Sequence, residues 1–148
     1  MFADLIRRLT APAPDPLPDP DARLALTALL VRIARADGDY AAAEVDRIDR
    51  IGMERYGLTP FEASALRREA ERLEAEAPDT VRFTRAIKDA VPYEERAAVV
   101  EAMWAVVLAD GVRDYEEDGL IRLVANLLGI GDKESALARQ RVEARQGA

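Results

Sequence analysis

Histidine and cysteine are both absent from this chain of 148 residues. Without cysteine there is no disulfide, no thiolate nucleophile and no zinc site built on sulfur. Without histidine there is no Ser-His-Asp triad and no imidazole to carry protons near neutral pH. Any metal ion bound by this chain must therefore be a hard cation held by oxygen ligands, such as Ca²⁺ or Mg²⁺.

Positive charge and long apolar runs are also scarce. The chain has 21 Lys and Arg against 28 Asp and Glu, a formal net charge of −7, so we expect no nucleic-acid partner. The most apolar stretch, Ala97–Ala109, has 13 residues and is interrupted by Glu101. A bilayer span needs about 20 apolar residues, so this stretch predicts a buried helix. Because no secretory signal begins the chain, we expect a cytoplasmic protein.

The first 20 residues divide into an arm and a spacer. Residues 1–10 predict a short amphipathic arm, whose apolar face carries Phe2, Leu5, Ile6 and Leu9. Residues 11–20 hold five prolines, which exclude helix interior and predict an extended spacer. Residues 21–148 predict one domain. We expect the arm to dock on this domain or on a partner, with binding to a membrane surface as the alternative.

The domain shows no strand alternation, and its apolar residues recur at helical spacing. Thr59, Pro60 and Glu62 form a strong helix start with a capping box. Gly38 and Gly57 follow helices where a left-handed cap is needed. The sequence therefore predicts an all-α, compact bundle. Its seven helices are expected near residues 21–37, 41–56, 59–77, 79–91, 92–110, 114–128 and 132–145.

Two of these helices differ sharply in their surroundings. The helix at 92–110 is the most apolar, so we expect it to be central and its Trp104 to be a core residue. The helix at 59–77 has a thin apolar stripe at Leu66, Ala70, Leu73 and Ala77. Its remaining charged residues predict a solvated face with pairs four residues apart.

An internal repeat is the most informative feature. Ala36-Asp37-Gly38 recurs as Ala109-Asp110-Gly111, an offset of 73 residues. At this offset Glu44 falls on Glu117 and Ile48 on Ile121. The pattern predicts two helical hairpins related by a pseudo-twofold axis, with the helices that end at Asp37 and Asp110 buried between them.

The acids of these two turns have two interpretations. Asp37 and Asp110 end helices, where the macrodipole disfavours negative charge. Each Asp could accept hydrogen bonds in its turn while the following Glu stabilises a helix start, which would be a structural role. Alternatively the turns converge on a Ca²⁺ or Mg²⁺ ion. The predicted metal ligands are then Asp37, Glu44, Asp110 and Glu117, with Asp39, Asp114 and Glu116 nearby.

The paired turns resemble the TerB-like family of tellurite-resistance proteins. The resemblance spans residues 22–134 and implies an all-helical fold with pseudo-twofold hairpins. It also implies an acidic patch that binds metal or partners, and a role in tellurite resistance and stress response alongside membrane-associated resistance proteins. Peripheral attachment to the inner membrane face would follow. The first turn departs from the family, because Ala41 stands where the second copy has Asp114.

Three functions follow from these observations. The first is a non-enzymatic binding module that holds a divalent cation or a protein partner; a second copy of the chain, as a homodimer, is one such partner. The second is a purely structural interaction domain whose acidic turns only cap helices. The third, an enzyme built on carboxylates such as Glu94, Glu95 and Glu101, is the least favoured. We therefore expect no catalytic residues.

Overall fold

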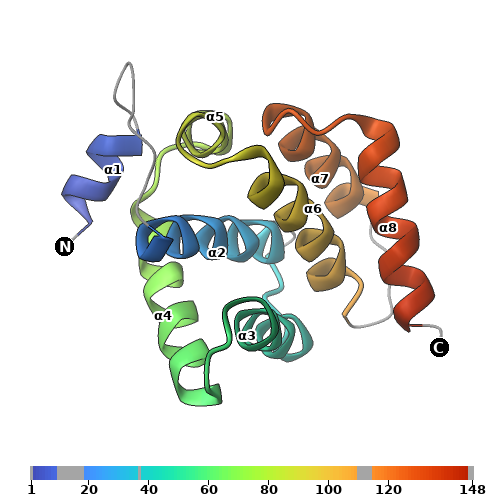
Figure 1. Ribbon diagram of the computed structural model, residues 1–148, viewed down its shortest axis with the longest axis horizontal. Coiled ribbons are helices and arrows are strands. Elements are labelled where there is room, and N and C mark those ends of the chain that lie inside the picture. Colours follow the sequence, from blue (N-terminus) through green and yellow to red (C-terminus); the bar gives the residue numbers. More distant parts are fainter. Residues whose placement is uncertain (1, 10–18, 37, 110–114, 147–148) are drawn as a thin grey trace.

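The computed structural model describes residues 2–9, 19–36, 38–109 and 115–146, with only the backbone described at residues 19 and 115–117. Within these residues every regular element is a helix, so the predicted all-α class is confirmed. The arm and the seven expected helices appear in chain order (Figure 1). They are α1 (Ala3–Leu9), α2 (Asp19–Arg35), α3 (Ala42–Tyr56), α4 (Pro60–Glu76), α5 (Thr80–Ala90), α6 (Tyr93–Val107), α7 (Tyr115–Leu127) and α8 (Asp132–Gln146).

The helix ends follow the local signals in the sequence. At the start of α4, the Thr59 side chain accepts a hydrogen bond from the Glu62 backbone and Glu62 returns one to Thr59, which confirms the capping box. Gly38 and Gly57 have φ angles of 80° and 67°, as left-handed caps require. One boundary differs from the prediction. Helix α2 begins at Asp19 rather than Asp21, because proline at Pro20 is tolerated in a first helical turn.

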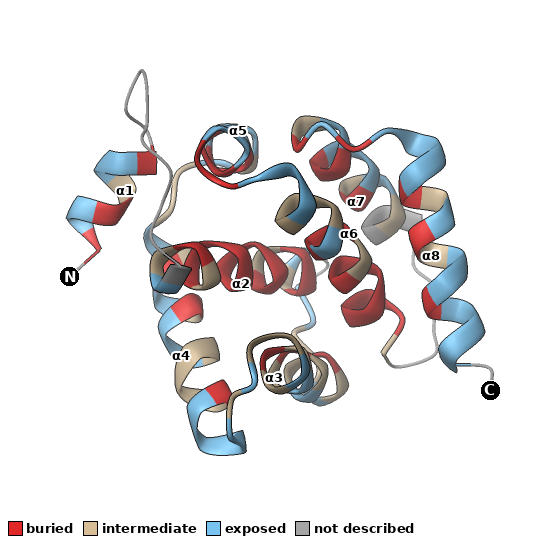
Figure 2. Cartoon of the chain, in the orientation of Figure 1, coloured by how far each residue is buried: buried red, intermediate tan, exposed pale blue. Residues whose placement is uncertain are grey.

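Helices α2 and α6 form the centre of the molecule. Figure 2 shows buried residues around most of their surfaces. Ala25, Leu29 and Ile33 of α2 are fully buried, as are Met103 and Val106 of α6. Trp104 is also buried, and its Nε1 donates to the Ser135 Oγ at 3.1 Å. The predicted central helix and core tryptophan are both confirmed.

The remaining helices cover this pair in a regular way. Helix α4 packs on α2 and contacts α3, while α8 packs on α6 and contacts α7. The two central helices contact each other, and each also contacts the helix that follows the other, α3 against α6 and α7 against α2. A pseudo-twofold arrangement would produce these pairings, but the symmetry itself stays a prediction.

Helix α1 lies against α5, separated from the rest of the fold by the spacer (Figure 1). The side chains of Phe2, Leu5 and Leu9 are buried there. The apolar face that could have met a membrane therefore contacts the domain. Among the described residues, no helix combines the length and apolar character needed to cross a bilayer.

Candidate functional site

The predicted metal ligands fall mainly where the structure gives little detail. Asp37, Asp110 and Asp114 lie outside the described residues. Glu116 and Glu117 lie in the first turn of α7, where only the backbone is described. Asp39 and Glu44 are therefore the two predicted ligands whose side chains can be placed.

Glu44 lies in the first turn of α3 and is only 4% exposed. Its Oε1 accepts a hydrogen bond of 3.1 Å from the backbone N–H of Ala41. Ala41 precedes the helix and has no polar side chain to cap it, so Glu44 satisfies a backbone donor at this helix start. Asp39 is exposed in the preceding turn. The structural interpretation of the first turn thus has direct support at Glu44.

Convergence of the two turns on a cation stays a prediction. Among the side chains that the structure places, no three Asp or Glu residues are grouped as a metal site. Of the four main predicted ligands, however, only Glu44 belongs to that set. The helices that lead into the turns, α2 and α6, do contact each other.

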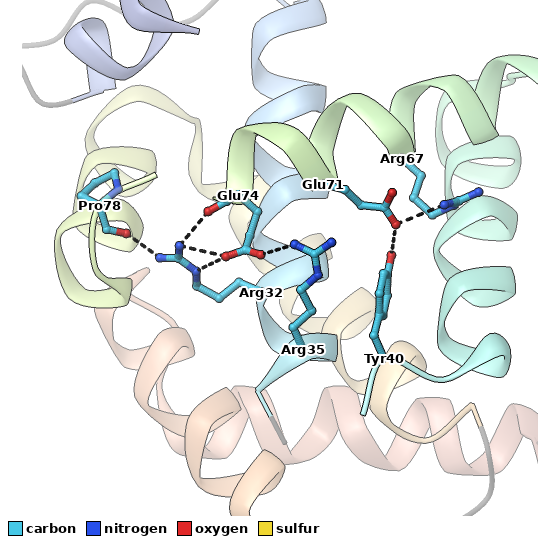
Figure 3. Close-up of polar contacts among 7 residues, drawn as sticks. All are labelled: Arg32, Arg35, Tyr40, Arg67, Glu71, Glu74 and Pro78. Atoms are coloured by element: carbon cyan, nitrogen blue, oxygen red, sulfur yellow. Dashed lines mark hydrogen bonds and ion pairs between the residues drawn. The ribbon is translucent and has the colours of Figure 1, made fainter. Parts of the chain in front are cut away.

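The sequence analysis missed a cluster of ion pairs that joins α2 to α4 (Figure 3). Arg32 donates from Nε and Nη2 to the Glu74 Oε2, at 3.1 and 3.0 Å. Its Nη1 also donates to the Pro78 carbonyl at 2.6 Å. Arg35 reaches the other oxygen of Glu74, with 2.7 Å between its Nη1 and Oε1. The side chains of Arg32 and Glu74 are each 13% exposed, so this clamp is largely shielded from water.

A second cluster extends from α4 to the acidic turn and to α3. Arg67 contacts Asp49 at 2.7 Å and Glu71 at 3.1 Å. The Tyr40 hydroxyl donates to the Glu71 Oε2 at 2.8 Å (Figure 3). Burial, together with this hydrogen bond to a carboxylate, raises the pKa of Tyr40 well above its usual range. The Tyr40 hydroxyl therefore stays protonated and fixes the turn next to Asp39.

The prediction of a solvated face on α4 was wrong for three of its charged residues. Arg67, Glu71 and Glu74 each lie one position beyond a member of the apolar stripe, which places them at the edge of the buried face. There they meet charges from α2 and α3. Residues on the opposite side, including Arg68, Glu69 and Glu76, are exposed as expected. Spacing relative to the stripe was the signal that could have separated the two groups.

The carboxylates considered for an enzyme do not form an acid–base pair. Glu101 is paired with Arg145 at 2.7 Å and with Arg141 at 3.3 Å. Glu94 is exposed and Glu95 is half-buried in the first turn of α6.

Comparison with known proteins agrees with this fold. A family model described as tellurite resistance protein TerB matches residues 23–140. No curated protein and no solved structure matches the chain. The matched region runs from α2 into α8 and includes both Asp-Gly turns. The match covers most of the chain, and the chain therefore belongs to the TerB family of tellurite-resistance proteins.

Proposed function

We propose that this chain is a non-enzymatic binding module in tellurite resistance and the associated stress response, and that its two acidic turns together hold one divalent cation. The observation that carries the proposal is the recurrence of Asp-Gly followed by Glu at two helix ends, 73 residues apart. Helices α2 and α6, which lead into these turns, are neighbours in the core.

The chemistry of the turns favours Ca²⁺ or Mg²⁺. Carboxylates are the ligands that these cations prefer, and the chain has no sulfur or imidazole ligand from cysteine or histidine for a softer metal. Four carboxylates brought together would repel each other unless a cation neutralised them. A bound cation would also offset the unfavourable position of Asp37 and Asp110 at helix ends.

Resistance would then arise by binding. Reduction of tellurite ordinarily requires thiols or a redox cofactor, and this chain has neither cysteine nor a glycine-rich dinucleotide loop. The loaded turns would present a surface to a protein partner, including a membrane-associated resistance protein. That partner would bring the module to the inner face of the membrane from the cytoplasm.

A purely structural role is the second function, and it is favoured by the hydrogen bond from Ala41 to Glu44. In that case the acids would only satisfy backbone donors and the chain would act as a helical interaction domain. The two functions differ in what the protein loses when the acids of the second turn are neutralised.

Calorimetric titration of EDTA-treated protein with CaCl₂ and with MgCl₂ separates them. The test variant is Asp110→Asn with Glu117→Gln; its control is Glu69→Gln with Glu76→Gln, the same charge change on the exposed face of α4. A cation site predicts heat for the parent and the control, and none for the test variant, which stays folded. Absence of both heat and thermal shift at millimolar metal would sink the cation proposal. A stability loss of about 0.5–2 kcal/mol per cap without metal binding would favour the structural role.

A further inference from the structure

We propose that a groove between α3 and α6 binds an acidic peptide segment of a partner protein. The groove encloses about 520 Å³ and is closed at one end by Arg145 of α8. Helices α3 and α6 contact each other beneath it (Figure 1). This surface does not depend on the acidic turns and has the opposite sign of charge.

The walls of the groove are rich in arginine. Its lining contains Arg47, Arg50, Arg55 and Arg145 against the two carboxylates of Glu54 and Glu101. The groove is therefore locally positive in a chain whose net charge is −7. Such a local field attracts and orients a negatively charged ligand.

Two of these arginines are available to a ligand. Arg47 is half-buried and Arg50 is exposed on α3, and neither forms an ion pair with another residue that the structure describes. By contrast Arg32, Arg35 and Arg67 are all paired within the fold. Guanidinium groups match carboxylates with two parallel hydrogen bonds, so the free pair favours Asp or Glu side chains.

The remaining groove arginines are already held in place. Arg55 donates to the Glu95 carbonyl at 3.3 Å and lies 5.6 Å from the centre of the Tyr56 ring. Arg145 is paired with Glu101 at 2.7 Å. These contacts fix the walls before a ligand arrives, which reduces the entropy lost on binding.

The floor of the groove is apolar and shallow. Ala98, Ala102 and Ala105 lie along α6 at helical spacing, opposite Ile51 of α3. Small side chains let a backbone approach closely, and Ile51 offers a surface for one apolar side chain. The combination fits a peptide in which acidic residues flank an apolar one. A groove between two helices fits such a segment better than a flat membrane, and its volume exceeds what a single small anion would fill.

The probe is a fluorescein-labelled peptide that repeats Glu-Leu-Glu, with a Gln-Leu-Gln peptide for comparison. Binding to the full chain is followed by fluorescence anisotropy in buffer containing EDTA. The test variant is Arg47→Gln with Arg50→Gln. Its control is Arg68→Gln with Arg72→Gln, which makes the same charge change on the exposed face of α4. Loss of two charged contacts should raise the Kd at least about tenfold, while the control stays within about twofold.

A second variant, Ala98→Glu, keeps the test valid if the arginine variant does not fold. Its substituted side chain is exposed in the groove and should weaken binding by repelling the peptide. Equal binding of the Gln peptide, equal loss in the control, or no binding at 1 mM peptide (roughly −4 kcal/mol) would overturn the proposal. So would arginine-dependent binding of phosphatidylserine vesicles, or arginine-dependent dimerisation, if either occurred without peptide binding. Asp110→Asn with Glu117→Gln should bind the peptide normally, which separates this test from that of the cation.

Discussion

Left-handed backbone at helix ends is the clearest single-residue requirement in this fold. Gly57 ends α3 with φ of 67°, a conformation that costs a side-chain-bearing residue about 1 kcal/mol. Gly119 lies within α7, and a Cβ added there would meet no atom within 4 Å. The same amino acid thus has opposite consequences at these two positions.

Replacing each glycine by alanine tests this contrast. We expect Gly57→Ala to lower the free energy of unfolding by about 1 kcal/mol, because the left-handed cap is strained by a Cβ. We expect Gly119→Ala to raise it by about 0.5–1 kcal/mol, because alanine favours the helix. Urea unfolding measures both, and a shift of the same sign for the two variants would contradict the assignment.

Glu62 predicts a pH-dependent contribution at the start of α4. Hydrogen bonds from Thr59, chiefly from its backbone N–H, lower the pKa of the exposed Glu62 carboxyl. Because the folded pKa lies below the unfolded one, the contribution to stability is present above the unfolded pKa. It is lost as the pH falls through the folded value.

The variant Glu62→Ala should therefore have a lower urea midpoint than the parent at pH 7. The difference should shrink as the pH falls towards about 3. Glu69→Ala, on the exposed face of the same helix, should show no comparable trend. A midpoint difference that stays constant with pH would exclude this role for the carboxylate.

At the scale of elements, the interface of α2 with α4 depends on charge as well as on apolar packing. Glu74 bridges Arg32 and Arg35 and is 13% exposed. Removing it leaves two guanidinium groups without their carboxylate at an interface that largely excludes water. Exposed pairs contribute at most about 1 kcal/mol, whereas breaking a buried pair costs about 3–5 kcal/mol.

We expect Glu74→Ala to destabilise the protein by about 2–4 kcal/mol, between those limits. Glu69→Ala provides the matched control and should change stability by less than about 0.5 kcal/mol. Thermal and urea unfolding give the comparison. Equal effects of the two substitutions would mean that the α4 charges act only as a solvated face.

The elements also show how far sequence pattern reached. The helix order and most helix ends followed from Pro, Gly and capping residues, because these act on the backbone within a few residues. The partners of Arg67, Glu71 and Glu74 did not, since they come from other helices. At the candidate cation site, the sequence supplied the repeated acids but not their separation, which depends on how the hairpins pack.

At the scale of the whole molecule, the arm adds apolar contact to a surface far along the chain. Leu9 is 2% exposed, and α1 packs on α5 across the spacer. Replacing Leu5 and Leu9 by alanine should weaken this docking, because a buried leucine contributes about 2 kcal/mol or more. Amide exchange in α1 should then accelerate by about 30-fold.

Exchange in α8, which lies away from the arm (Figure 1), provides the internal reference. It should be unchanged if α1 is released locally. Unaltered exchange in α1 would show that its docking does not depend on these leucines.

The sequence by itself determined the helical class, the positions of most helices and the exclusion of sulfur and imidazole chemistry. These properties depend on composition and on interactions within a few residues. Only the tertiary structure decided that Glu74 clamps α2 to α4 and that Arg47 and Arg50 line a positive groove. The physical reason is that a charged side chain next to an apolar stripe can face water or a neighbouring helix with equal local preference. Packing of distant segments selects between the two.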